Sequence, residues 1–116
     1  MSPRRRAATK AKALPNHAPL FAALGDETRL TLVRKLCGGE PRSISQLTRG
    51  SRLTRQAITK HLRVLEAAGL ARSRRRGRER LWQLERQRLQ EARRYLDSIS
   101  RQWDEALARL RDLVEK

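Results

Sequence analysis

The chain has 116 residues and a formal net charge of +16, with 28 Lys and Arg residues against 12 Asp and Glu. This length suits one domain with a modest core. The basic excess favours a polyanionic partner, and nucleic acid rather than a membrane. The sequence shows no signal-peptide pattern and no long apolar run, so we expect a cytoplasmic protein with no membrane partner.

The composition divides the chain into three parts. Residues 1–16 carry five basic side chains, no acid and almost nothing to bury. They predict a disordered basic arm, which either contacts phosphates or is a solvated tail. Residues 17–85 combine apolar segments with caps and glycines and predict the folded domain, and residues 86–116 predict one long helix.

Two short helices are expected at the start of the domain. The first covers 18–24 and ends at Gly25. The second covers 27–37, with Asp26 as its N-cap and a buried stripe of leucine and valine residues. That stripe is predicted to contain Leu30, Val33 and Leu36.

A helix-turn-helix is predicted next. Ser43 and Gln46 fit a capping box that opens a short helix ending near Gly50. Thr54 fits the N-cap of the following helix, which continues to residue 69. Two short helices joined by a glycine-containing turn are typical of a DNA-binding helix-turn-helix.

The second of these helices has the pattern of a recognition helix. With Ile58 set inward on a helical wheel, Leu62 and Leu65 share its face and the long polar side chains point away. Arg and Lys can read guanine, Gln can read adenine, and Thr can meet the methyl group of thymine. A merely solvated face is the alternative. The residues predicted to contact DNA from this helix are Thr54, Arg55, Gln56, Thr59, Lys60, His61 and Arg63.

His61 and Cys37 each allow two interpretations. His61 falls about 60° from the core axis of the wheel, so it is either a structural histidine or a phosphate contact. Cys37 ends an apolar stripe and is expected in the core, with a redox sensor as the alternative. The sequence has no Cys/His metal spacing, no phosphate-binding glycine loop and no catalytic constellation, so we expect no cofactor, no metal and no enzymatic activity.

Residues 70–84 predict a β-hairpin with Gly77 in its turn. Four arginines surround that glycine, and a basic hairpin tip beside a helix-turn-helix can reach a phosphate run or a minor groove. The arginines predicted to contact DNA are Arg74, Arg75, Arg76 and Arg78.

The last part of the chain predicts a dimerisation helix. Between residues 87 and 115 there is no Gly or Pro, and apolar residues step by three or four over about four heptads. A helix of roughly 40 Å is longer than the small domain can cover, and a second copy is the simplest partner. The residues predicted at the dimer interface, with the first helix completing it, are Leu20, Phe21, Leu24, Leu96, Ile99, Trp103, Ala106 and Leu110.

Three stretches resemble the ArsR/SmtB family of winged-helix repressors. LGDETRLTLVRKLCGGE is similar to the family pattern L-x-D-x-T-R-L-x-I-L-x-x-L followed by GE, and TRQAITKHLRVLEAAGLA is similar to S-x-x-x-V-S-x-H-L-x-x-L-x-x-A-G-L-V. RRGRERLWQL resembles the wing pattern R-x-G-R-x-x-x-Y-x-L, with Trp82 where the family usually has Tyr.

The resemblance implies a mainly α fold with a small β-hairpin wing, and a bacterial, nucleoid-associated homodimer that represses transcription at an inverted repeat. Metal sensors of the family carry Cys-x-Cys on the helix that here reads ISQLTRG, or Asp-x-His and His on the last helix, and neither set is present. The last helix instead resembles a non-metal subgroup with a W-x-x-x-L-x-x-L tail. The alternatives are an architectural DNA-binding protein of low specificity and an RNA-binding protein, and no inducer is indicated.

Overall fold

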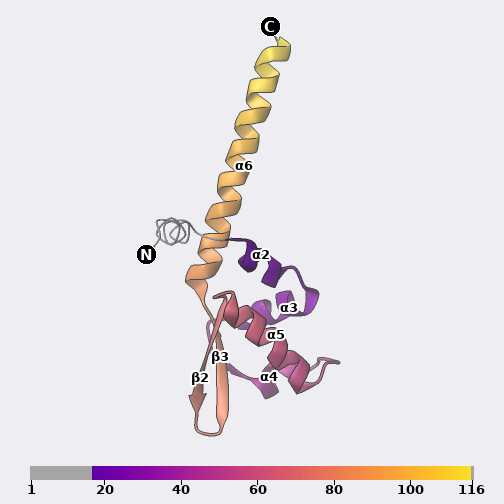
Figure 1. The fold of residues 1–116 in the computed structure, drawn as a ribbon, viewed down its shortest axis with the longest axis vertical. Helices are drawn as coiled ribbons and strands as arrows, with labels where there is room; N and C mark the ends of the chain where they lie inside the picture. The colour runs from indigo at the N-terminus through magenta and orange to yellow at the C-terminus, as the bar shows by residue number, and fades with distance from the viewer. Residues whose placement is uncertain (1–16, 116) are drawn as a thin grey trace, which may run out of the picture.

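The computed structural model describes residues 17–115, and the helices and strands follow the predicted order (Figure 1). The predicted basic arm over 1–16 lies outside the described residues. The helices are α2 (Ala18–Leu24), α3 (Glu27–Leu36), α4 (Ile44–Thr48), α5 (Arg55–Ala67) and α6 (Arg86–Glu115), and the strands are β1 (Arg42–Ser43), β2 (Ala71–Arg76) and β3 (Glu79–Leu84).

Side-chain caps begin three of the helices where the sequence predicts them. The carboxylate of Asp26 accepts a hydrogen bond from the backbone N–H of Arg29 at 3.0 Å. Ser43 and Gln46 form the reciprocal capping box of α4. Thr54 Oγ1 accepts from the backbone N–H of Ala57 at 3.1 Å and starts α5. Each cap satisfies a backbone donor that the first helical turn leaves without a partner.

The predicted hairpin is confirmed, and it is part of a three-stranded antiparallel sheet in the order β1-β3-β2. β2 pairs with β3 from Ala71 opposite Leu84 to Arg76 opposite Glu79. Gly77 takes a φ of 62° in the two-residue turn, a conformation that glycine adopts at no steric cost. The strand β1 was not predicted, because two residues are too short to show an alternating pattern.

The core lies between the helices and one face of the sheet. Its fully buried side chains include Leu62, Leu65 and Trp82, as the wheel and the hairpin predict. The prediction for α3 is wrong at one position, since Leu30 is 48% exposed and Leu32 is buried instead. Steps of three residues rotate about 60° backwards on a helix, so Leu30 and Leu36 cannot share one narrow face.

Two further predictions are corrected by the burial of the side chains. Leu20 is fully buried in the core of its own chain, so it has no surface to offer to a dimer interface. Cys37 is exposed rather than in the core. The helix ends at Leu36, and a Cβ added at Gly38 or Gly39 would meet nothing, so the chain has left the core at this point.

Helix α6 extends far beyond the rest of the molecule (Figure 1). The radius of gyration is 19.4 Å, against about 13 Å for a compact chain of 100 residues. Its first turns pack on the body through Leu89 and Ala92. The later apolar residues are open to solvent, with Leu96 53% and Trp103 65% exposed. No helix among residues 17–115 is both long and apolar enough to cross a membrane.

Candidate nucleic-acid interface

The recognition helix α5 presents polar side chains opposite its buried face. Ile58 and Leu62 lie in the core, while Arg55, Gln56 and Lys60 are exposed. The predicted division between an inward apolar face and an outward donor-rich face is therefore present. The cap residue Thr54 is exposed as well, at the helix end that enters the groove in helix-turn-helix proteins.

Helices α4 and α5 are joined by a hydrogen bond at this surface. Arg55 Nη2 donates to Ser45 Oγ at 2.7 Å. Thr59 is half-buried, and its Oγ1 donates to the carbonyl of Arg55, four residues earlier, at 2.8 Å. An open recess of about 610 Å³ lies between the two helices, and the residues lining it are Ile44, Arg55, Gln56, Thr59 and Lys60.

Arg63 connects the recognition helix to the sheet. Its Nη1 donates to Glu66 Oε1 at 2.8 Å, and its guanidinium lies 5.2 Å from the centre of the Trp82 ring. Glu66 Oε2 accepts from Ser73 Oγ at 3.0 Å, and Arg80 donates to the same hydroxyl at 3.0 Å. The hydrogen bond from Arg63 is the main reason that the pKa of Glu66 lies below its usual value. Sequence reasoning missed this network because Ser73, Arg80 and Trp82 lie on the strands, whereas Arg63 and Glu66 lie on α5.

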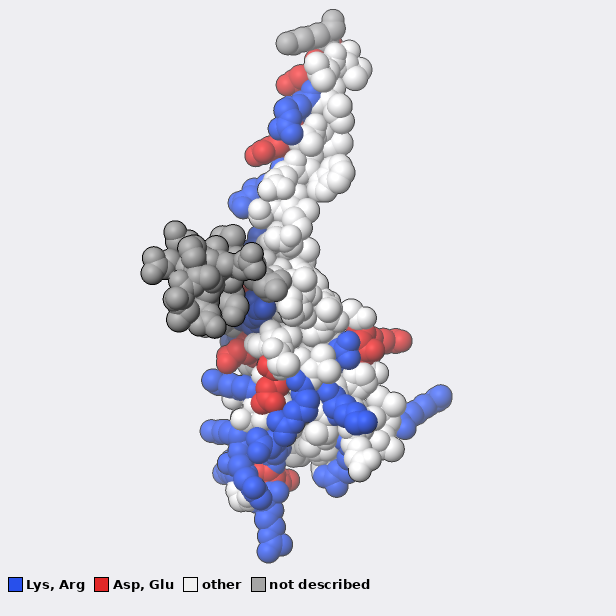
Figure 2. All heavy atoms as spheres, viewed as in Figure 1, with Lys and Arg blue, Asp and Glu red and all other residues white. Residues whose placement is uncertain are grey.

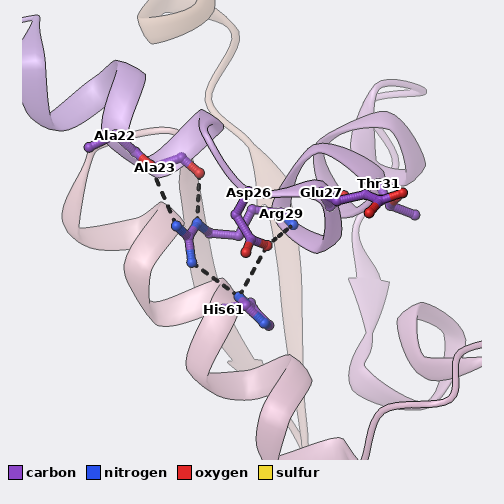
Figure 3. A network of polar contacts seen from close by, with 7 residues as sticks. All are labelled: Ala22, Ala23, Asp26, Glu27, Arg29, Thr31 and His61. Carbon is purple, nitrogen blue, oxygen red and sulfur yellow. Dashed lines mark hydrogen bonds and ion pairs between the residues drawn. The ribbon is translucent and has the colours of Figure 1, made fainter.

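His61 faces the start of α3 and the end of α2 (Figure 3). Its Nδ1 lies 3.2 Å from Arg29 Nη1 and 3.8 Å from a carboxylate oxygen of Asp26. Arg29 also donates from Nε to the carbonyl of Ala23 at 2.7 Å. Because a guanidinium only donates, Nδ1 is the acceptor in the contact with Arg29. The structure therefore gives His61 a structural contact, which is one of the two interpretations that the sequence allows, and its predicted contact with DNA stays a prediction.

Asp26 and Arg29 were not predicted to act on the recognition helix. Their place in the quoted L-x-D-x-T-R pattern was the only signal that could have found them. The hydrogen bond from the backbone of Arg29 is the largest cause that holds the pKa of Asp26 below its usual value. This network joins α2, α3 and α5, so it fixes the recognition helix α5 against α2 and α3.

The wing carries four exposed arginines around its tip, Arg74, Arg75, Arg76 and Arg78. Lys and Arg side chains gather over the wing and the lower body in Figure 2, whereas along α6 they alternate with acidic side chains. Arg75 lies directly opposite Arg80 in the ladder. Like charges in that position destabilise a sheet. The concentration of positive charge in the wing therefore lowers the stability of this strand pair.

The residues with metal-binding chemistry lie apart. His17 is the N-cap of α2, Cys37 follows α3, and His61 lies on α5. Within residues 17–115 no three His, Cys, Asp or Glu side chains gather into a cluster that could hold a metal ion.

Comparisons with known proteins agree with this architecture. Residues 24–74 match a family described as a helix-turn-helix domain. The chain is 36% identical over 95 residues to the HTH-type transcriptional regulator Rv2034 of Mycobacterium tuberculosis, covering 82% of this chain and 85% of that one. It is 40% identical over 72 residues to the uncharacterized HTH-type transcriptional regulator YuzN of Bacillus subtilis, covering 57% of this chain and 78% of that one.

Among solved structures, an ArsR-like transcriptional regulator from Rhodococcus sp. RHA1 shares 38% identity, with a TM-score of 0.77 over 85% of this chain and 90% of that one. The helix-turn-helix, the basic wing and the exposed face of α5 define a DNA-binding transcriptional regulator of the winged-helix class. Within this class, the chain belongs to the family of ArsR-like regulators.

Proposed function

We propose that this regulator is a homodimeric repressor that binds an inverted repeat with sequence specificity and does not respond to metal. The observation that carries the proposal is the pairing of an exposed, donor-rich α5 face with an arginine-rich wing at one end of the molecule (Figure 1). Side chains of α5 would read base edges in the major groove. The wing arginines would hold the phosphates beside it.

The exposed apolar face of α6 supports the homodimer. Large apolar residues with more than half of their surface exposed follow one another along it, and they are Leu96, Trp103, Leu107, Leu110, Leu113 and Val114. Soluble monomers rarely leave such a contiguous patch open. A second copy related by a twofold axis would cover it and would set the two recognition helices about 34 Å apart, one turn of DNA. A dimer seated across two grooves would occlude a promoter, which supports repression.

Metal independence is supported by the placement of the donors. The two histidines and the cysteine lie on separate elements, so none of them finds a second such ligand on its own element. We expect no stoichiometric transition metal in protein purified without a histidine tag. Elemental analysis tests this, and one zinc per subunit that is lost on mutating these residues would contradict it.

The decisive test separates sequence-specific regulation from architectural binding. A labelled fragment of the promoter of its own gene is titrated with the protein at moderate salt, in competition with random duplex. We expect the promoter to be preferred and the affinity to fall steeply as salt rises, because arginines that neutralise phosphates release counterions. Equal competition by both duplexes would favour an architectural protein of low specificity.

A further inference from the structure

The recess between α4 and α5 differs chemically from the charged surface around it. Two of its five lining residues, Ile44 and Thr59, are β-branched and half-buried. Ile44 packs partly against the core, so its position in the recess is fixed by the fold. The other three lining residues are Arg55, Gln56 and Lys60, which are exposed and polar.

The hydroxyl of Thr59 is already occupied. It donates to the backbone carbonyl of Arg55 at 2.8 Å, the internal bond that a helical threonine makes four residues back. Its remaining group is a methyl. Arg55 is likewise held toward α4 by its bond to Ser45 at 2.7 Å. The recess therefore offers the methyl of Thr59 and the side chain of Ile44 as an aliphatic surface, with Gln56 and Lys60 beside it.

Duplex DNA has one apolar group in the major groove, the 5-methyl of thymine. We infer that Ile44 and Thr59 form a thymine-methyl pocket, so that the operator carries a thymine opposite the first turns of α5. This inference rests on the proposed function, and it adds a specificity determinant that acts by apolar contact. Neither a phosphate nor a guanine edge offers a group that this aliphatic surface would bind.

The DNA side of the inference is tested first. A duplex that the protein itself selects from a random library is remade with deoxyuridine in place of each thymine in turn, which removes one methyl group. Burying one such group corresponds to about a fourfold change in affinity. We expect a loss of that size at one thymine in each half-site. 5-Bromodeoxyuridine, whose bromine fills the volume of the methyl, should restore the affinity, and deoxyuridine outside the protected site should have no effect.

Two matched variants test the protein side. Thr59→Ser keeps the hydroxyl bond to Arg55 and removes the methyl, so the preference for thymine over uracil should fall below twofold. Thr59→Val removes the hydroxyl and keeps two methyl groups, so the preference should persist. Thermal unfolding of both variants confirms that each is folded.

Three results would overturn the inference while the proposed function stands. They are a selected site with no thymine sensitive to loss of its methyl, a preference that Thr59→Ser leaves intact, and a preference that Thr59→Val abolishes. Failure to select any site would instead overturn the proposed function, and this inference with it.

Discussion

The body of the molecule and the distal half of α6 differ in the burial of their apolar residues, and the two tryptophans show the contrast. Trp82 is 0% exposed and packs among leucines from several elements, whereas Trp103 is 65% exposed. The body buries most of its large apolar side chains within one chain. The distal half of α6 exposes its large apolar side chains. One chain therefore sets the fold of the body, while the proposed second copy would cover α6.

The largest effect is expected in the body. Trp82→Ala should lower the free energy of unfolding by about 3–5 kcal/mol, the usual cost of truncating a buried aromatic. Trp82→Phe is the matched control. It keeps an aromatic ring and removes the Nε1–H, which has no hydrogen-bond partner within the described chain. Urea unfolding followed by circular dichroism measures the stability of both variants. An alanine variant as stable as the wild type would contradict the burial of Trp82 in the core.

The network around Arg29 acts within the body, because it links the end of α2 to the recognition helix (Figure 3). Arg29→Ala removes hydrogen bonds from a charged donor, which typically contribute about 1.5–3 kcal/mol. We expect a loss of stability in that range. Arg34→Ala, at an exposed position of the same helix, is the control and should change little. Equal melting temperatures for the two variants would contradict the role of the network.

Within the body, substitutions in the recognition helix and in the wing should affect DNA binding differently. Gln56→Ala and Lys60→Ala should each remove about 1–3 kcal/mol of discrimination between operator and random DNA. Arg75→Ala combined with Arg76→Ala should weaken all sequences alike and flatten the salt dependence, since these arginines are proposed to meet phosphates. Binding titrations over a range of salt concentrations compare the variants. An unchanged operator-to-random ratio in both helix variants would refute the assignment.

The smallest effect concerns the link between α5 and the wing. Because the pKa of Glu66 in the folded chain lies below its ordinary value, its contacts stabilise the fold when the carboxylate is ionised, as it is at neutral pH. This stability is lost as the pH falls through the folded pKa. Glu66→Gln should therefore cost up to about 1 kcal/mol at neutral pH, as partly exposed ion pairs do. The difference from the wild type should vanish below the folded pKa, and melting curves at several pH values test this.

Local signals in the sequence were enough to predict most elements. The caps Asp26, Ser43 and Thr54 act within four residues, and the turn at Gly77 is equally local. Because these signals are local, the starts of the helices and the position of the hairpin could be predicted from the sequence. The predicted contacts of individual side chains with DNA remain predictions.

Long-range packing decided what the sequence could not show. The three-residue steps in α3 do not define one narrow face, and the elements packed against the helix decide which side is buried, so Leu30 was misassigned to the core. Likewise, the stacking of Arg63 on Trp82 and the bond between Arg29 and His61 join residues that are 19 and 32 positions apart. No spacing rule within one helix or strand indicates such pairs.

Sedimentation of the full chain at micromolar concentration, in parallel for the wild type and Trp103→Ala, tests most directly whether a second copy covers α6. We expect a wild-type dimer. Large aromatics dominate such interfaces, and loss of a buried one typically costs about 3–5 kcal/mol. The variant should therefore dissociate and lose operator affinity, although Trp103 lies in the second half of α6, a helix that extends away from the wing (Figure 1). A monomeric wild type, or a variant dimer as tight as the wild type, would contradict the account.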